Sequence, residues 1–272
     1  MKTINFTLSI CLTLALNACM NDNDMDSLDA FENDGSLTEW SKPFHTICPT
    51  VTDAVMRPVP WTVDVERTFT ISEQTIQSMS TCGLLVTMLE FPTHPSSSNS
   101  FYNPSFTYFN SLFSKNKVAV EFFNRSDCFP VIASKYLTLI NDKENECHAK
   151  EGGYQGGDID YIEKVLASDL CMSVMNDNKK NQIMTLALAY HEKNNVCDNY
   201  AFLAQTYTIM ISILLWEKYT PFIEEVGPRI REGSVGYYLI EPNGDTLCNC
   251  LLISHVELIV KHAKEFLNEQ KK

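Results

Sequence analysis

The stretch Tyr200–Trp216 reads YAFLAQTYTIMISILLW and is apolar along nearly its whole length. Charged residues close it on both sides, at Asp198 and at Glu217, and Gln205 interrupts it. It is shorter than the roughly 20 apolar residues that a membrane-spanning helix requires. A helix that is apolar on all sides is also typical of the centre of a helical protein. The sequence therefore predicts a buried core helix over these residues.

Apolar residues also recur with helical spacing in the sequence before and after this segment. The strongest example is C-terminal, where Val256, Ile259, Ala263 and Phe266 form one apolar stripe opposite charged residues. Other helices are predicted from spacing and capping residues. These windows are 72–79, 80–91, 109–123, 126–140, 158–170 and 183–190.

One short segment near the C-terminus has strand character instead. Residues 235–241 and 246–251 flank Pro242-Asn243-Gly244-Asp245, which predicts a β-hairpin with a tight turn. We therefore expect a mostly α fold, either a multi-helix bundle or a helical superhelix, with a small C-terminal β-hairpin.

The N-terminus has the pattern of a secretory signal peptide. Lys2 is followed by an apolar run from Ile4 to Leu16, and the small residue Ala18 precedes the expected cut. The ending Leu16-Asn17-Ala18-Cys19 resembles the lipobox of bacterial lipoproteins. That resemblance implies that residues 1–18 are a lipoprotein signal peptide, that cleavage follows Ala18, and that acyl chains such as palmitate are attached to Cys19. The alternative is an ordinary signal peptide with a chance cysteine.

Residues 19–39 carry the expected lipidated cysteine and an acidic segment. Six acidic residues lie between Asp22 and Asp34 with no Lys or Arg among them. A segment this polar cannot offset the entropy lost on ordering, so we expect a flexible tether. An acidic run after the lipidated cysteine resembles a surface-export signal of some Gram-negative lineages, which favours a surface-exposed outer-membrane location. A spacer in the periplasm is the alternative.

Residues 40–272 are expected to form the folded body, with a possible sub-boundary near 142–157, where a Gly-rich run follows a mixed-charge stretch. The chain is 44% hydrophobic, which is enough for a substantial core. Without residues 1–18, 20 basic and 34 acidic side chains leave a net charge of −14. This balance argues against nucleic acid as a partner, because phosphates require clustered Lys and Arg. The expected partners are the membrane, through the lipid on Cys19, and a protein or glycan ligand.

Eight cysteines lie beyond Cys19, and the sequence does not determine which of them pair in disulfides. An exported compartment allows disulfides to form. We expect two or fewer, and we expect Cys82 and Cys171, inside apolar helical patterns, to be free and buried. Beyond Cys19 the cysteines are Cys48, Cys82, Cys128, Cys147, Cys171, Cys197, Cys248 and Cys250.

No metal, cofactor or catalytic residue is predicted. Cys248 and Cys250 with His255 and His262 offer zinc-type ligands, but two to four residues normally separate paired cysteines. Both histidines fall at the edge of the amphipathic helix, where packing and solvation explain them. Cys147-His148, beside the glycines, suggests a thiol nucleophile, yet a flexible connector is the simpler reading.

Two further groups of side chains have simpler readings too. Asp158, Asp160 and Glu163 suggest a weak calcium site, whereas carboxylates at a helix start complement the helix dipole. His191-Glu192 lacks the second histidine of a zinc protease.

Aromatic residues gather in the Ser/Pro/Asn-rich loop and on the predicted hairpin. Exposed aromatics on loops are typical of protein- or sugar-binding faces. Covering of the helical core is the reading that we favour. The residues are Phe101, Tyr102, Phe106, Tyr108, Phe109, Tyr237 and Tyr238.

Two motifs resemble a group of uncharacterised bacterial lipoproteins. One runs from Met79-Ser80-Thr81-Cys82-Gly83-Leu84 to Leu89-Glu90-Phe91-Pro92, and the other is Pro242-Asn243-Gly244 ahead of a C-terminal amphipathic helix. The resemblance implies a mostly helical exported domain and no catalytic residues. We therefore expect a non-enzymatic surface lipoprotein that binds a protein or glycan. The alternative is a cell-envelope hydrolase whose site is assembled only in the fold.

Overall fold

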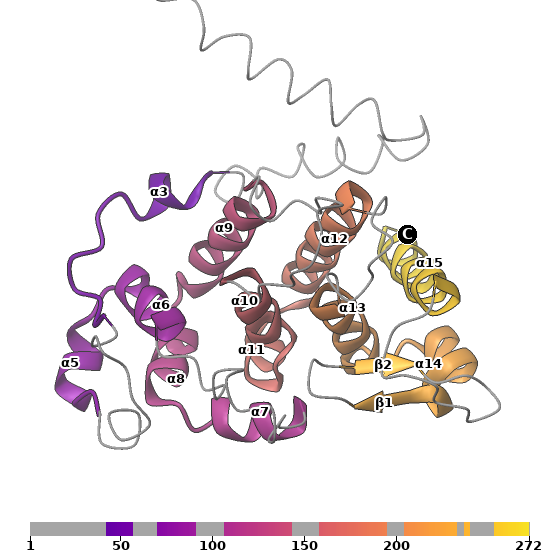
Figure 1. Cartoon of the computed structure of the whole chain (residues 1–272), viewed down its shortest axis with the longest axis horizontal. Coiled ribbons are helices and arrows are strands. Elements are labelled where there is room, and N and C mark those ends of the chain that lie inside the picture. The colour runs from indigo at the N-terminus through magenta and orange to yellow at the C-terminus, as the bar shows by residue number, and fades with distance from the viewer. Residues whose placement is uncertain are drawn as a thin grey trace, which may run out of the picture. The chain divides into compact units, whose positions relative to one another are not determined.

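A computed structural model describes residues 42–56, 70–90, 106–142, 158–194, 204–232, 237–239 and 253–271. The chain divides into the units Met1–Lys42 and Pro43–Lys272, and the elements below belong to the second unit. This unit is mostly α, as the sequence predicts (Figure 1). Its helices are α3 (Phe44–Ile47), α5 (Glu73–Ser78), α6 (Thr81–Glu90), α7 (Phe106–Phe113), α8 (Lys117–Asn124), α9 (Cys128–Ile140), α10 (Asp158–Ala167), α11 (Asp169–Val174), α12 (Asp177–Asn194), α13 (Ala204–Trp216), α14 (Thr220–Val226) and α15 (Ile253–Gln270), with the 3₁₀ turn η4 (Gly227–Arg229).

The larger helices form two layers. One layer holds α9, α12 and α15, and the other holds α6, α10 and α13 (Figure 1). Successive helices pair across the layers, α9 with α10 and α12 with α13, so each pair packs on the next one along the chain. This stacking of helix pairs corresponds to the superhelical alternative of the prediction.

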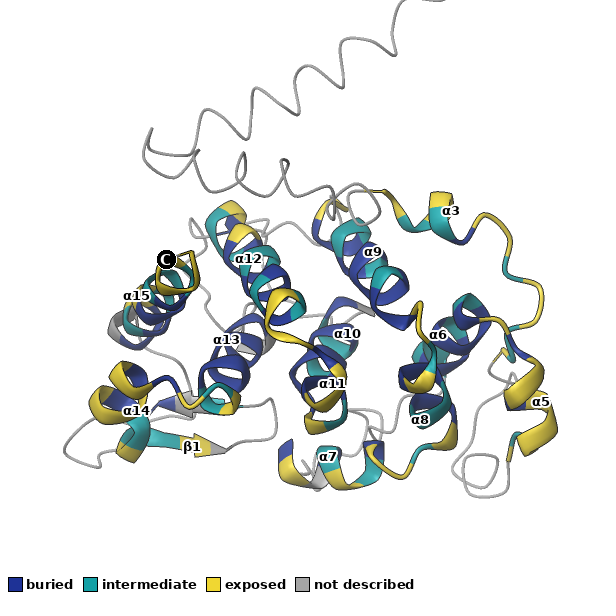
Figure 2. Cartoon of the chain, turned by 180° about the vertical axis from the view of Figure 1, so that it is seen from behind, coloured by how far each residue is buried: buried dark blue, intermediate teal, exposed yellow. Residues whose placement is uncertain are grey.

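Helix α13 forms the centre of this arrangement. It packs against α10, α12 and α15, and its side chains from Thr206 to Leu214 are buried on every side (Figure 2). The predicted core helix is therefore confirmed. Among the described helices, none is both long and apolar enough to cross a membrane.

The C-terminal helix α15 also follows the prediction. Its apolar stripe is buried, from Val256 through Ile259 and Ala263 to Phe266. The opposite face is more open, and Glu257 and Lys261 on it are exposed. The three- and four-residue spacing thus identified the buried face correctly.

The small β element includes a strand pairing that the sequence did not predict. Strand β2 (Tyr237–Leu239) lies inside the predicted strand 235–241, and it pairs antiparallel with β1 (Ile230–Glu232). The sequence reading treated residues 227–233 as a break rather than as a strand. The predicted partner strand, 246–251, lies outside the described residues.

Several short helices escaped sequence analysis. Helix α3 lies in the proline-rich region, α11 is separated from α10 only by Ser168, and α14 begins with Pro221 in its first turn. Each has at most seven residues, too few for an apolar period to repeat. Most of the predicted sub-boundary, residues 143–157, lies outside the described part of the chain, and so do residues 1–41.

The first turns of the helices show which of the predicted N-cap residues accept a backbone hydrogen bond. Ser80 caps α6, since its Oγ accepts the Gly83 N–H at 3.0 Å. Asp127 occupies the N-cap position of α9, but its carboxylate accepts the Thr81 hydroxyl at 2.6 Å and caps no backbone N–H. Asp158 is the first residue of α10 rather than its cap.

Candidate functional site

The predicted lipid-attachment residue Cys19 and the predicted cleavage position after Ala18 lie outside the described residues. Their roles remain predictions from the sequence. Candidate functional groups in the body must therefore come from its described polar clusters.

The most unusual of these clusters surrounds a buried carboxyl group. Glu163 on α10 is 1% exposed. Its Oε1 accepts two hydrogen bonds, from the Tyr136 hydroxyl of α9 at 2.7 Å and from the Thr206 hydroxyl of α13 at 2.8 Å. Three helices of the two layers therefore meet at one carboxyl oxygen.

This placement corrects the sequence reading of Asp158, Asp160 and Glu163 as a surface group of carboxylates that serves the helix dipole. Glu163 points into the interior, because position 163 falls on the same face of α10 as the buried residues Ile159 and Leu166. Among the described residues, no group of three or more His, Cys, Asp or Glu side chains is arranged to hold a metal ion.

Burial controls the protonation of this cluster. The two hydroxyl donors favour the carboxylate, but loss of solvation outweighs them and raises the pKa of Glu163 to about 8. Burial and the neighbouring Glu163 also raise the pKa of Tyr136 well above its usual range. The cluster is therefore neutral at pH 7, with the acid proton on Glu163.

A second polar pair, partly buried, lies between α12 and α13. His191 Nδ1 is 3.0 Å from the Tyr207 hydroxyl, and burial lowers the pKa of His191. The histidine that the sequence singled out beside Glu192 thus packs between two core helices. It contacts an aromatic hydroxyl, as a half-buried histidine commonly does.

The two histidines of the weighed metal cluster are both buried on α15. His255 is 2% exposed and His262 is 1% exposed. His262 lies between two carboxylates, with Nε2 at 2.8 Å from Glu225 and Nδ1 at 3.4 Å from Glu265. The sequence reading placed both histidines at the edge of the helix, whereas the structure places them inside. Cys248 and Cys250 lie outside the described residues.

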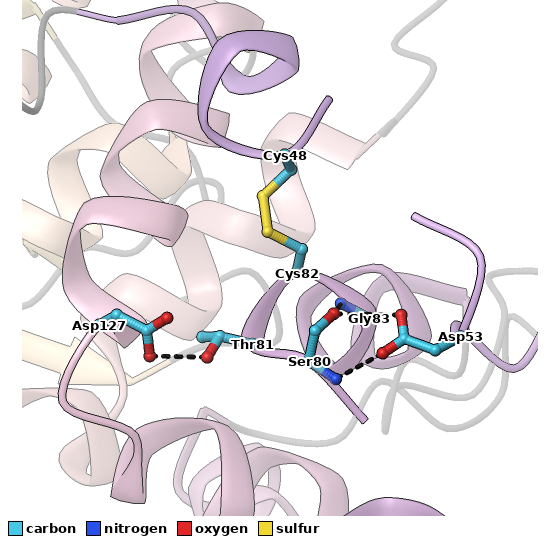
Figure 3. The surroundings of a disulfide bond; sticks show 7 residues. All are labelled: Cys48, Asp53, Ser80, Thr81, Cys82, Gly83 and Asp127. Carbon is cyan, nitrogen blue, oxygen red and sulfur yellow. Dashed lines mark hydrogen bonds between the residues drawn. A yellow bond between two sulfur atoms is a disulfide. The ribbon is translucent and has the colours of Figure 1, made fainter. Parts of the chain in front are cut away.

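One disulfide joins the N-terminal segment to α6. Cys48 and Cys82 are bonded (Figure 3), so the expectation of a free, buried Cys82 is wrong. The apolar neighbours of Cys82 concealed its pairing, because its side chain faces the segment 43–56 and not the core. The same segment is fixed by hydrogen bonds to the core helices, from Phe44 N to the Thr138 hydroxyl and from Val55 N to the Thr87 hydroxyl.

Asp53 completes this attachment at the start of α6. Its carboxylate accepts the backbone N–H and the hydroxyl of Ser80 (Figure 3). The Ser80 N–H lowers the pKa of Asp53. A Cβ on Gly83 would lie 2.3 Å from Asp53 Oδ1, so a larger residue there would displace the Asp53 carboxylate from this position.

Two cysteines are free and buried, Cys128 on α9 and Cys171 on α11. Cys171 behaves as the sequence predicts. Burial raises the pKa of both thiols, so both are protonated at pH 7 and weakly nucleophilic. The remaining cysteines, Cys147, Cys197, Cys248 and Cys250, lie outside the described residues.

The aromatic residues that are described cover the core, as favoured from the sequence. Phe106 and Phe109 are buried and stack at 5.9 Å between ring centroids. Tyr237 of β2 meets Phe106 edge-on. The side chains of Phe101, Tyr102, Tyr108 and Tyr238 are not described.

A different aromatic residue is exposed, and sequence analysis missed it. Trp216, the last residue of the core helix α13, is 42% exposed. The next residue, Glu217, is ion-paired with the buried Lys180 of α12, which also lies 3.5 Å from Asp177. The turn between α11 and α12 is thereby held next to the end of α13, and it too is exposed (Figure 2). We call Asp177, Trp216 and Glu217 the Trp216 face.

This face combines a large apolar ring with carboxylates. The side chain of Asp177 is mostly exposed, and that of Glu217 is partly buried against Lys180. Tryptophan is apolar along its body and carries one N–H donor, so an exposed ring can stack on a ligand and still donate a hydrogen bond. The exposure of Trp216 could have been predicted from its position, because it is the last residue of the apolar run and the charged residues Glu217 and Lys218 follow it.

Comparison of the chain with protein-family models, with curated proteins and with solved structures finds no match.

Proposed function

We propose that the chain is an exported protein, anchored by lipid on Cys19 to the outer membrane and exposed at the cell surface. The disulfide between Cys48 and Cys82 is the observation that supports export, whereas the lipid anchor and the surface location rest on the sequence of residues 1–39. Disulfides persist in oxidising compartments and are rare in the cytosol.

We further propose that the body binds a protein or glycan through the Trp216 face. Exposed tryptophans account for much of the binding energy at recognition surfaces. The indole can stack on the apolar C–H face of a sugar or on an apolar side chain. The carboxylates of Asp177 and Glu217 can accept hydrogen bonds from sugar hydroxyls or from peptide N–H groups.

A cell-envelope hydrolase is the alternative, and Glu163 is the observation that favours it. A carboxyl group with a raised pKa is a frequent mark of a general acid. Glu163 is, however, 1% exposed and its described partners are hydroxyl groups of the core helices. A polymer substrate could not reach it without separation of α9, α10 and α13. We therefore assign Glu163 a structural role.

Lipid attachment is tested by metabolic labelling with an alkyne fatty acid. We expect label on the N-terminal peptide that begins at Cys19 and no label on a Cys19→Ser variant. Mass spectrometry of that peptide should show cleavage after Ala18. An unlabelled wild-type chain, or a label that survives in Cys19→Ser, would contradict the anchor.

Ligand binding is tested with the mature body on a glycan array and on immobilised extracellular proteins. A Trp216→Ala variant should lose roughly tenfold or more in affinity for any ligand captured by the wild type. Ile223→Ala is the matched control, because Ile223 is also an exposed apolar residue but lies on α14. Equal losses in both variants would place the binding site elsewhere. Release of soluble fragments from a glycan would favour the hydrolase.

A further inference from the structure

Residues 43–56, which we call the strap, run along the outside of α9 and α6 (Figure 1). The strap includes α3, which packs against α9, and the Cys48–Cys82 disulfide joins it to α6. Of residues 43–56, Cys48 alone is buried, and α3 itself contributes no buried side chain. The strap therefore lies on the helical body and is not part of its core.

The non-covalent attachments that the structure shows for the strap are mostly polar. They are the hydrogen bonds from Phe44 N to the Thr138 hydroxyl at 2.9 Å, from Val55 N to the Thr87 hydroxyl at 2.8 Å and from Ser80 to the Asp53 carboxylate, and the Lys135 ammonium over the Phe44 ring. Each of these hydrogen bonds can be exchanged for one to water, so its net contribution is small.

Ordering the strap costs conformational entropy at every residue from 43 to 56. A few hydrogen bonds that water can replace do not offset that cost, and burial of Cys48 alone adds little apolar stabilisation. When the strap leaves, water reaches the hydroxyls of Thr87 and Thr138, so neither is left without a partner. The disulfide is therefore the attachment that keeps the strap in place.

We propose that the strap is a redox switch. A dithiol reductant opens the bond between Cys48 and Cys82, the strap leaves α6 and α9, and the helical body stays folded. Release uncovers the surfaces of α6 and α9 that carry Thr87 and Thr138. This inference goes beyond the proposed function and does not depend on the lipid anchor or on the Trp216 face.

The exchange begins at the more accessible cysteine. Cys82 is half-buried at the start of α6, whereas Cys48 is buried. A thiolate of the dithiol attacks Cys82 Sγ and forms a mixed disulfide, and Cys48 leaves as a thiolate that takes up a proton. The second thiol of the reductant then displaces Cys82. Both cysteines end as thiols, and the reductant ends as a disulfide.

The test is hydrogen–deuterium exchange of the full mature chain, oxidised and after treatment with dithiothreitol under native conditions. Alkylation and mass spectrometry establish that Cys48 and Cys82 are reduced. The hydrogen-bonded amides that report on the strap are those of Phe44, Thr46, Cys48 and Val55. We expect strap peptides to exchange roughly tenfold or more faster after reduction, while α13 stays unexchanged over the same short times.

Two variants separate this bond from any other thiol. Cys48→Ser should show the fast strap exchange without reductant. Cys128→Ala, which removes a free cysteine of α9 and keeps the disulfide, should behave as the wild type in both states. Three results would overturn the proposal. These are a bond that dithiothreitol leaves intact in the folded protein, a strap that stays protected after reduction, and an α13 that exchanges together with the strap.

Discussion

Replacement of Glu163 by glutamine should remove a large pH dependence from the stability of the body. The pKa of this buried carboxyl is raised from 4.5 to about 8, chiefly by loss of solvation. In the folded protein Glu163 therefore holds its proton up to about pH 8, whereas the unfolded chain releases it near pH 4.5. The free energy of unfolding is highest below the unfolded pKa and falls as the pH rises through the folded one.

The size of the effect follows from these two values. The difference between 4.5 and about 8 is worth about 5 kcal/mol in total, at about 1.4 kcal/mol per tenfold change in proton affinity. About 4 kcal/mol of this is lost between about pH 5 and pH 8.5. For a body of this size, that loss lowers the melting temperature by roughly 10 °C.

Glutamine is the informative substitution because it is uncharged and keeps the acceptor oxygen. Its Oε1 can accept both hydroxyls, from Tyr136 and Thr206, as the Glu163 oxygen does. We expect Glu163→Gln to match the wild type near pH 5 and to be clearly more stable near pH 8.5. The assay is urea unfolding, or calorimetry, across this range.

The control for this comparison is Glu224→Gln, an exposed carboxylate of α14. It should keep the pH dependence of the wild type. If Glu163→Gln loses stability in parallel with the wild type as the pH rises, Glu163 is ionised in the folded state and the reasoning fails.

Three further predictions concern stability and are checked by urea unfolding. Cys48→Ser opens a disulfide that spans 34 residues and should cost about 3–4 kcal/mol in an oxidised sample, with no difference from the wild type after reduction. Gly83→Ala places a Cβ 2.3 Å from Asp53 Oδ1, displaces that carboxylate from Ser80 and should cost about 1 kcal/mol, whereas Gly227→Ala, whose nearest contact is 3.4 Å, should cost less. Leu214→Ala, at a fully buried position of α13, should cost about 2–5 kcal/mol, and a loss below 1 kcal/mol would contradict the central place of that helix.

The sequence predicted the parts of the fold that repeat a pattern over several turns. The apolar run that ends at Trp216 identified the core helix, and the stripe from Val256 to Phe266 identified the buried face of α15. Short helices such as α11 and α14 contain fewer than two apolar repeats, so periodicity could not find them.

The polar clusters could not be predicted because their partners are distant in the sequence. Glu163 meets Tyr136 and Thr206 across 27 and 43 residues. His262 meets Glu225 across 37 residues. A carboxylate near a helix start and a histidine on an amphipathic helix both read as surface features until the packing of α10 against α13 and of α14 against α15 is known.

The most direct test of the proposed surface location is protease shaving of intact cells, with detection of the body beside a Cys19→Ser control. We predict that the wild-type body is removed from intact cells, while a periplasmic marker stays whole and the Cys19→Ser chain is lost from the surface fraction. Protection of the wild-type body until the outer membrane is opened would contradict surface exposure.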